Sequence, residues 1–285
     1  MRQNKRPRHP WRTLCTVLWL IAALSGFVWW GNTTLQTAAF TLSLADLPAG
    51  FEGYRTVVLS DLHSAEFGAD NADLFAAVRT AQPEAIFLLG DLVDRYRGAP
   101  SGYIEAVADG LCAIAPTYYV TGNHEWAIGN VRAMKNALTD HGVTVLSNQF
   151  LPLERGGDSL LLAGIDDPNG YADQKTPEAL AAEIAALPGD PFWMLLAHRN
   201  DRFETEYSRL GADLVLSGHG HGGIIRLPFT DGLLSTDRTF FPSYTAGEYT
   251  VAGAELFVTR GVGNSGPSLR LFNRPEVAVL TLIQK

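Results

Sequence analysis

The chain has few cysteines and no excess of basic residues. Only two cysteines occur among its 285 residues. Cys15 lies in an apolar run and Cys112 in the globular part, so we do not expect a disulfide, and a structural zinc site cannot be built on one thiolate. Lysines and arginines number 22 against 30 aspartates and glutamates, for a net charge of −8. This bulk charge does not indicate a nucleic-acid partner.

Charge is also unevenly placed near the amino terminus. Residues 13–30 contain no charged side chain and consist mainly of Leu, Val, Ile, Ala and Trp. Eighteen residues reach the length of a membrane-spanning helix, and Trp29 and Trp30 stand where an interfacial aromatic belt would lie. The preceding segment holds five basic side chains and no acidic one, namely Arg2, Lys5, Arg6, Arg8 and Arg12. Without them the chain has 17 basic residues and a net charge of −13.

We therefore expect residues 1–12 to form a basic cytoplasmic tail and residues 13–31 a transmembrane anchor, equivalent to an uncleaved signal sequence. Because basic residues stay in the cytoplasm, the globular part should lie outside it, in a single-pass protein of the cell membrane. An alternative stays open. Cleavage near the small residues Thr37, Ala38 and Ala39 would release a secreted or wall-associated protein.

The remainder, residues 40–285, is expected to form one α/β domain. Predicted strands at residues 55–60, 85–89 and 118–121 alternate with predicted helices at 71–80, 101–111 and 128–141, which favours right-handed crossovers and a parallel sheet. Beyond His141, short strands separated by Asn, Gly and Asp predict a more antiparallel region. The aromatic side chains of Tyr244, Phe240 and Phe241 are expected in the core, and an apolar substrate channel lined by them is the alternative.

Five apolar strands each run directly into Asp, Asn or His. Residues 56–60 lead to Asp61 and His63, and residues 86–89 lead through Gly90 to Asp91 and Asp94. The other three strands lead to Asn123 with His124, to His198, and to His219 with His221. Open α/β sheets place their ligands at the carboxyl ends of strands, so we expect these side chains to meet on one rim.

A site of this composition is typical of metal binding. Asp, Asn and His without cysteine favour manganese, iron, zinc or magnesium over copper(I) or iron–sulfur clusters. Asp61 and His63 are two residues apart, so an extended chain would place both side chains on one side of a single ion. Seven candidate ligands are too many for one tetrahedral ion. Two divalent ions that share a carboxylate fit better, and such pairs clamp phosphoryl oxygens.

The ordered set Asp61-x-His63, Gly90-Asp91-x-x-Asp94, Gly122-Asn123-His124-Glu125, His198 and Gly218-His219-x-His221 resembles the calcineurin-like metallophosphoesterase superfamily. The basic amino terminus, the single apolar segment and the motifs at residues 259–263 and 273–276 resemble its YkuE/YaeI-like, membrane-associated branch. The resemblance covers residues 40–285. It implies a four-layer αββα sandwich of the α/β (α+β) class, preceded by the transmembrane helix.

The resemblance also implies a role for each residue of the set. Asp91 would bridge two ions, His124 would donate a proton to the leaving group, and Asp94 would orient the His124 ring. The segment His198-Arg199-Asn200-Asp201 replaces the His-x-Pro-Asp of related proteins, which puts the local turn in doubt. Glu125 is expected to support the site without binding metal. The first ion would be held by Asp61, His63 and His221, and the second by Asn123, His198 and His219.

These expectations describe a membrane-anchored, monomeric phosphoesterase with a dinuclear metal centre. A hydroxide that bridges the metals would attack phosphorus and break a P–O bond, with a phosphodiester favoured as substrate and a lipid-linked one as an option. Two alternatives stay open. A pyrophosphate hydrolase resembling the UDP-2,3-diacylglucosamine enzymes would need a cytoplasmic catalytic domain. The second alternative is not an enzyme but a non-catalytic, metal-binding module that interacts with other proteins.

Overall fold

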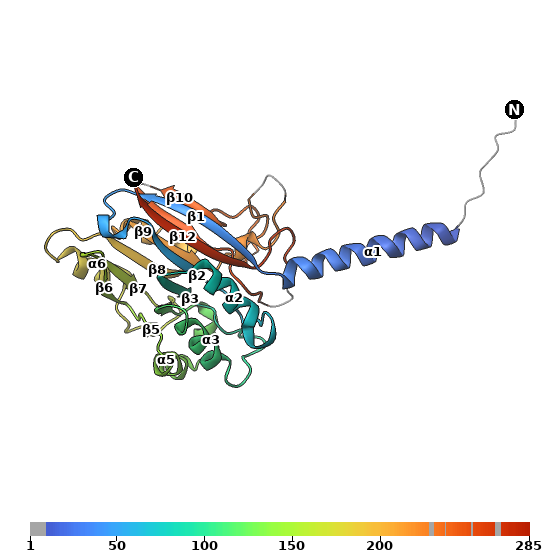
Figure 1. Cartoon of the computed structure of the whole chain (residues 1–285), viewed down its shortest axis with the longest axis horizontal. Coiled ribbons are helices and arrows are strands. Elements are labelled where there is room, and N and C mark those ends of the chain that lie inside the picture. The colour runs from blue at the N-terminus through green and yellow to red at the C-terminus, as the bar shows by residue number, and fades with distance from the viewer. Residues whose placement is uncertain (1–9, 228–230, 237, 252, 266–268) are drawn as a thin grey trace, which may run out of the picture.

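The structure is a computed structural model that describes residues 10–285 except 228–230, 237, 252 and 266–268. The predicted basic tail at residues 1–12 therefore falls largely outside the described residues, and only Arg12 of its five basic side chains is placed. A rounded α/β body carries a single long helix, which projects from one end (Figure 1).

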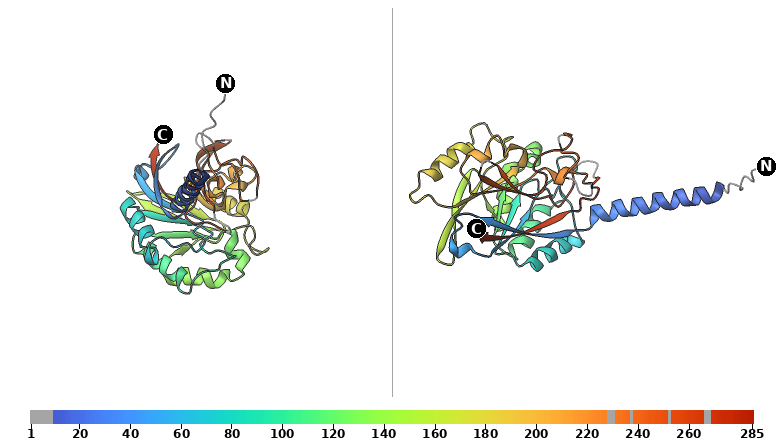
Figure 2. Two further views of the ribbon diagram at one scale, coloured as in Figure 1. Left: turned by 90° about the vertical axis from the view of Figure 1, so that its right-hand side faces the viewer. Right: turned by 90° about the horizontal axis from the view of Figure 1, so that it is seen from above.

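The projecting helix is α1, Pro10–Thr33. None of its side chains is buried, and its mean hydropathy of 1.8 over 18 residues makes it long and apolar enough to cross a membrane. An apolar helix exposed on all sides is unfavourable in water and favourable in lipid. The right-hand view of Figure 2 shows α1 standing clear of the body. The predicted apolar helix is therefore confirmed.

Two six-stranded sheets form the body. The first has the order β1-β12-β2-β3-β4-β5, in which β2 to β5 are mutually parallel and β12 runs antiparallel to β2. Its strands are β1 (Gln36–Leu44), β12 (Glu276–Gln284), β2 (Tyr54–Leu59), β3 (Ala85–Leu89), β4 (Thr117–Val120) and β5 (Thr144–Val145).

The second sheet has the order β10-β11-β9-β8-β7-β6. Its strands are β10 (Gly247–Val251), β11 (Ala254–Val258), β9 (Leu214–Gly218), β8 (Trp193–Arg199), β7 (Asp158–Gly164) and β6 (Gln149–Arg155). Only the outer pairs β6–β7 and β10–β11 are antiparallel. The antiparallel region predicted beyond His141 is thus limited to the edges of this sheet, because the four strands between them are joined by crossovers and run parallel.

The sheets pack face to face, and helices cover both outer faces. Along β2, Val57 and Leu59 face α2 (Ala72–Ala81), α3 (Tyr103–Cys112) and α5 (Val131–Asp140), whereas Val58 faces the second sheet. The outer face of the second sheet packs on α6 (Pro177–Ala185). Strands buried on both faces read as continuous apolar runs, which explains their clear signal in the sequence. The predicted four-layer αββα sandwich is confirmed.

One predicted helix begins later than expected. A helix was predicted at residues 128–141, but α5 begins at Val131, and a short helix that was not predicted, α4 (Asn123–Ile128), precedes it and is separated from it at Gly129. Gly129 has a φ of +82°, a left-handed conformation that glycine adopts without strain. The break lets α4 start directly at the end of β4, where Asn123 and His124 are placed.

Strand direction places the strand ends that carry the predicted ligands at the end of the body from which α1 leaves. β1 starts at Gln36, three residues after α1 ends, and runs away from the helix. β12 is parallel to β1 and β2 is antiparallel to β12, so the carboxyl end of β2 points back toward α1. The carboxyl ends of β3 and β4 share that direction.

Candidate metal centre

The structure brings all seven predicted ligands together. Asp61 and His63 follow β2, Asp91 follows β3, and Asn123 begins α4. His198 lies in β8, and His219 and His221 follow β9. Three groups of side chains among the described residues could hold a metal ion. Two of them contain six of these residues, namely Asp61, His63 and His221, and Asp91, His198 and His219. The third consists of His63, Asp91 and His124. Asn123 joins the second group through its amide oxygen, 3.3 Å from His198 Nε2.

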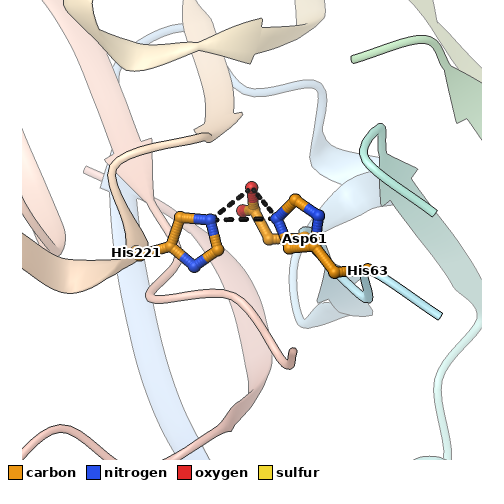
Figure 3. Close-up of side chains that lie close together, drawn as sticks. All are labelled: Asp61, His63 and His221. Carbon is orange, nitrogen blue, oxygen red and sulfur yellow. Dashed lines mark hydrogen bonds and ion pairs between the residues drawn. The ribbon is translucent and has the colours of Figure 1, made fainter. Parts of the chain in front are cut away.

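The first group is compact and buried (Figure 3). Asp61 Oδ1 lies 3.4 Å from His221 Nε2 and 3.8 Å from His63 Nε2, and the two ring nitrogens are 3.0 Å apart. Asp61 Oδ1 is buried without a hydrogen-bond partner, whereas Oδ2 accepts from the His219 N–H. A buried carboxylate oxygen without a donor is costly, and a cation between these three atoms would satisfy it.

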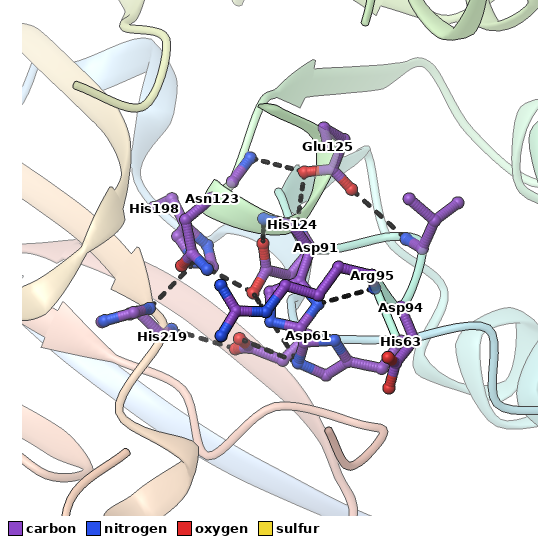
Figure 4. A network of polar contacts seen from close by, with 12 residues as sticks. Asp61, His63, Asp91, Asp94, Arg95, Asn123, His124, Glu125, His198 and His219 are labelled. Carbon is purple, nitrogen blue, oxygen red and sulfur yellow. Dashed lines mark hydrogen bonds and ion pairs between the residues drawn. The ribbon is translucent and has the colours of Figure 1, made fainter. Parts of the chain in front are cut away.

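The second group lies beside the first, and its carboxylate, Asp91, also approaches a histidine of the first group (Figure 4). Asp91 Oδ2 lies 3.4 Å from His198 Nε2 and 3.7 Å from His63 Nε2. His219 Nδ1 is 3.2 Å from the same His198 nitrogen. His198 Nδ1 donates to the Leu89 carbonyl at 2.7 Å, which fixes the ring and leaves Nε2 free to bind an ion. Asp91 is therefore the one carboxylate placed between both groups.

Burial controls the charges of these side chains. It lowers the pKa of His63 to about 3 and holds the pKa of His221 well below its usual range, so both imidazoles are neutral, as metal ligands must be. Burial also raises the pKa of Asp61 to about 6. Burial opposes the charge of His198 as well, but the Asp91 carboxylate raises the pKa of His198 to about 10. The residues present fit divalent cations, because a cation beside Asp91 would replace the proton that this carboxylate draws onto His198.

The backbone reaches this arrangement differently from the prediction. Asp61 and His63 were expected to lie in extended chain, but their φ angles are +55° and +48°. His219 and His221 also have positive φ, +65° and +47°. The side chains converge because the chain turns sharply after each strand. The inference from alternation along an extended strand was wrong, although the residues it paired do meet.

His124 lies beside the shared carboxylate, with Nε2 at 3.9 Å from Asp91 Oδ2. The N–H of Arg95 donates to His124 Nδ1 at 3.0 Å. Asp94 was expected to orient this ring, but among the described residues its carboxylate accepts hydrogen bonds from Tyr96 and Arg97. The expected contact between the Asp94 carboxylate and the His124 ring is absent, because the carboxylate turns toward residues 96 and 97 instead. Asp94 and His124 are connected through the turn that carries Arg95, whose N–H contacts the ring.

The calcineurin-like phosphoesterase model matches residues 54–223, more than half of the chain and all seven of these side chains. The chain belongs to the calcineurin-like phosphoesterase family. The family uses divalent metals, and its members hydrolyse phosphoesters, so this chain is a hydrolase of that class.

Curated relatives support the membrane-associated branch. The uncharacterized metallophosphoesterase YkuE of Bacillus subtilis is 28% identical and aligns over 87% of this chain and 85% of its own. Phosphodiesterase YaeI of Escherichia coli is 31% identical, over 81% of this chain and 82% of its own. A transmembrane protein with metallophosphoesterase domain from Danio rerio is 29% identical over 84% of this chain, which spans 55% of that protein. Together with α1, these relatives suggest a membrane protein.

In this phosphoesterase, Glu125 supports the site as expected. Its buried carboxylate accepts hydrogen bonds from the N–H groups of Asp91, Val93 and Gly122 at 3.0, 3.2 and 2.7 Å. These bonds tie the turn after β3 to the start of α4, which are the two segments that carry Asp91 and Asn123. Burial raises the pKa of Glu125 to about 7.

Sequence reasoning assigned no role to the residues that hold His221, although two of them lie in or beside the carboxyl-terminal motifs it singled out. Asn273 donates to the His221 carbonyl at 2.7 Å. Arg270 is fully buried and places a guanidinium nitrogen 3.2 Å from His221 Nδ1. The same guanidinium donates to the carbonyls of Gly263 and Arg260 at 2.6 and 2.8 Å. Arg270 was missed because nothing in its local sequence marks it as buried.

A cleft of about 680 Å³ opens above the phosphoesterase site. Asp91, Asn123, His124, His219 and His221 contribute to its wall, and so do three arginines, Arg95, Arg199 and Arg270. Arg199 stands in the segment that departs from the family pattern. Its Nε donates to Asp167 at 2.7 Å, and its NH1 lies 3.5 Å from His219 Nε2. Arg199 fills the variable position of that segment and places a cation at the edge of the metal centre, whereas the departure itself is Asn200, whose side-chain amide donates to the Tyr244 carbonyl at 2.8 Å.

Proposed function

We propose that the chain is a membrane-anchored phosphodiesterase with two divalent ions. In this proposal residues 1–12 are cytoplasmic, residues 13–31 anchor the protein, and the domain at residues 40–285 lies outside the cytoplasm. The observation that carries the dinuclear site is the position of Asp91 Oδ2, within 3.7 Å of His63 in one ligand group and 3.4 Å of His198 in the other. Manganese, iron, zinc and magnesium all suit these donors.

Each ligand group is assigned one ion. Asp61, His63 and His221 would hold the first, and Asn123, His198 and His219 the second, with Asp91 shared. When bound, two such ions neutralise charge on phosphoryl oxygens and lower the pKa of a water molecule that attacks phosphorus. Arg95 and Arg199 in the cleft wall supply further positive charge for a phosphoester anion.

His124 is proposed as the proton donor to the leaving oxygen. Because its Nδ1 accepts the Arg95 N–H, the neutral ring carries its proton on Nε2, the atom that faces Asp91 and the cleft. Cleavage of the P–O bond leaves an alkoxide, which takes this proton. Asp94 is assigned a positioning role, since it shapes the turn at residues 94–98 that carries Arg95.

Strand pairing supports an anchor that is not removed. Residues 36–39 of β1 pair with residues 276–279 of β12, so cleavage after Ala39 would delete four of the nine residue pairs that join these strands. Beyond the strand, Asn32 at the end of α1 exchanges hydrogen bonds with both backbone groups of Arg270, at 2.8 and 2.9 Å. These contacts make the helix end part of the folded body, which a cleaved signal peptide is not.

The decisive assay compares bis-p-nitrophenyl phosphate with p-nitrophenyl phosphate. The full chain in detergent is stripped with a chelator and then supplied with manganese, zinc or magnesium. We expect cleavage that depends on added metal, with the diester preferred, as the name of the Escherichia coli relative YaeI suggests. Two bound ions per chain without cleavage of either ester would refute the catalytic proposal and favour a metal-binding interaction module.

Two substitutions separate the proposed roles. His124→Gln should retain both ions and lose roughly 10²-fold to 10⁴-fold in turnover, because only proton donation is removed. Asp91→Asn should lower the metal content itself, and two ions at full stoichiometry would contradict the bridging role. His141→Gln is the matched control, since His141 lies outside the cleft and pairs with Asp109. It should behave as the unmodified chain.

A further inference from the structure

Outside α1, more than half of the exposed large apolar side chains of the described residues belong to one part of the chain. Nine such side chains occur among the described residues of the body, and five of them belong to residues 227–272. Phe240 and Phe241 are 68% and 72% exposed, so the expectation that they belong to the core was wrong. Leu269 and Phe272 are 48% and 52% exposed. Exposed phenylalanines in a group are unusual on a surface that meets only water.

These four side chains, here called the apolar rim, lie on two segments that are joined to each other. Phe241 donates its N–H to the Leu233 carbonyl, and Leu233 donates to Ile225. Ile225 in turn forms a bridge with Leu271, the neighbour of Phe272. Leu269 also lines the catalytic cleft. Figures 1 and 2 show both segments at the end of the body from which α1 leaves.

The rim is fixed relative to α1. The rings of Phe272 and Phe27 lie 5.4 Å apart, which places rim and helix in contact. Arg274 stacks on Trp30 at 4.7 Å and donates to the carbonyls of Thr34 and Leu35. With the Asn32 bonds to Arg270, these contacts prevent the body from swinging freely on its helix. The orientation of α1 therefore sets the orientation of the rim.

Helix length then defines the depth of the rim. At 1.5 Å per residue, the 24 residues of α1 extend about 36 Å, slightly more than the roughly 30 Å of a bilayer hydrocarbon core. The end of a spanning α1, with Trp29 and Trp30, would lie at the headgroup level. Phe272, in contact with the last turns of the helix, would lie at that level too.

We propose that the apolar rim rests in the headgroup region of the bilayer that α1 spans, so that the catalytic cleft opens onto the membrane surface. This inference rests on the proposed membrane anchor. It deepens the proposed function by naming the substrate class, a phosphoester whose polar group is held at a bilayer surface by an apolar chain. Such a substrate would reach the metal centre past Leu269 without leaving the interface.

Fluorescence quenching tests the proposal with the full chain in phosphatidylcholine vesicles. Single cysteines are introduced by Phe241→Cys or Leu269→Cys in a Cys15→Ala, Cys112→Ala background and labelled with bimane. Leu187→Cys is the control, because Leu187 is an exposed apolar residue that follows α6, at the opposite end of the body from α1 (Figure 1). Leu20→Cys, in the middle of α1, reports insertion of the helix.

Lipids that carry a nitroxide near the headgroup should quench positions 241 and 269 at least twofold and leave position 187 unchanged. Lipids with the nitroxide deep in the acyl chain should quench position 20. Quenching at 20 with none at 241 and 269 would overturn the rim proposal while the anchor stands. Absence of quenching at all four positions would overturn both, and the metal-dependent hydrolysis assay would still judge the phosphoesterase separately.

Discussion

Gly263 is a position at which a single added methyl group should disturb the metal centre. Its N–H donates to the Asp61 carbonyl at 2.6 Å. A Cβ added to Gly263 would overlap the Leu62 carbonyl and lie 2.8 Å from the Asp61 carbonyl oxygen. Carbon–oxygen contacts are ordinarily about 3.3 Å or longer. Both oxygens belong to the backbone, so no side-chain rotation relieves the overlap.

Gly263→Ala must therefore push residues 61–62 away by roughly 1 Å, and Asp61 moves relative to His63 and His221. A displacement of about 1 Å in an active site lowers the rate roughly 100-fold, equivalent to about 2.7 kcal/mol of transition-state stabilisation. We expect kcat/KM for bis-p-nitrophenyl phosphate to fall by that factor and the metal content to drop below that of the unmodified chain. Elemental analysis and initial rates measure both.

The control is Gly31→Ala, at the end of α1, where an added Cβ meets no atom within 4 Å. It should leave rate and metal content unchanged. Full activity and full metal content in Gly263→Ala would refute the reasoning, because they would mean that the turn after β2 moves without effect on the ions. Circular dichroism shows whether Gly263→Ala is folded. Gly263→Ser adds the same Cβ, so it should show the same loss.

Three further predictions follow from the supporting contacts. Glu125→Ala leaves three buried N–H groups without acceptors, so the free energy of unfolding should fall by about 3 kcal/mol in urea titrations; an unchanged midpoint would contradict this. Asn32→Ala removes two hydrogen bonds to Arg270 and should weaken metal binding about tenfold, whereas Thr33→Ala should not. Chelation should lower the thermal midpoint, because ions at 100 times their Kd stabilise the folded chain by about 2.7 kcal/mol.

The sequence allowed the strand ends to be predicted because of how the strands are buried. Each central strand is covered on both faces, so Val57, Val58 and Leu59 all had to be apolar. A polar residue that follows such a run lies outside the core, at the carboxyl end of its strand. Parallel strands place these carboxyl ends at one edge of the sheet. Burial of the strands, their direction and the meeting of the ligands at one edge are therefore linked, and all three could be inferred from the order of apolar and polar residues in the sequence.

The local backbone of the ligands could not be inferred in the same way. Asp61, His63, Asp91, His219 and His221 all have positive φ angles, between +47° and +65°. Left-handed backbone costs roughly 1–2 kcal/mol for each residue with a Cβ, so local preference argues against the observed conformation. Contacts distant in sequence impose it, such as the Asp61 carboxylate that accepts the His219 N–H. Such strain is found where function requires it.

The placement of α1 also depends on contacts that no local pattern reveals. The apolar run predicted a spanning helix, but nothing in it indicates that Asn32 binds Arg270 or that Trp30 stacks on Arg274. Those partners lie about 240 residues further along the chain. The two carboxyl-terminal motifs indicated the branch of the family. Their contacts with α1 and with the metal-binding turns are seen only in the structure.

That role connects the anchor with the metal centre. Residues 259–276 contact the Asp61 turn through Gly263, hold His221 through Asn273, and contact the end of α1 through Arg270. Glu276 binds Arg260 at 2.7 Å and thereby closes the two ends of this segment on each other. A fragment that starts at residue 40 would lose Asn32 and the first four pairs of β1 at once. Its metal affinity and its activity should therefore both lie below those of the full chain.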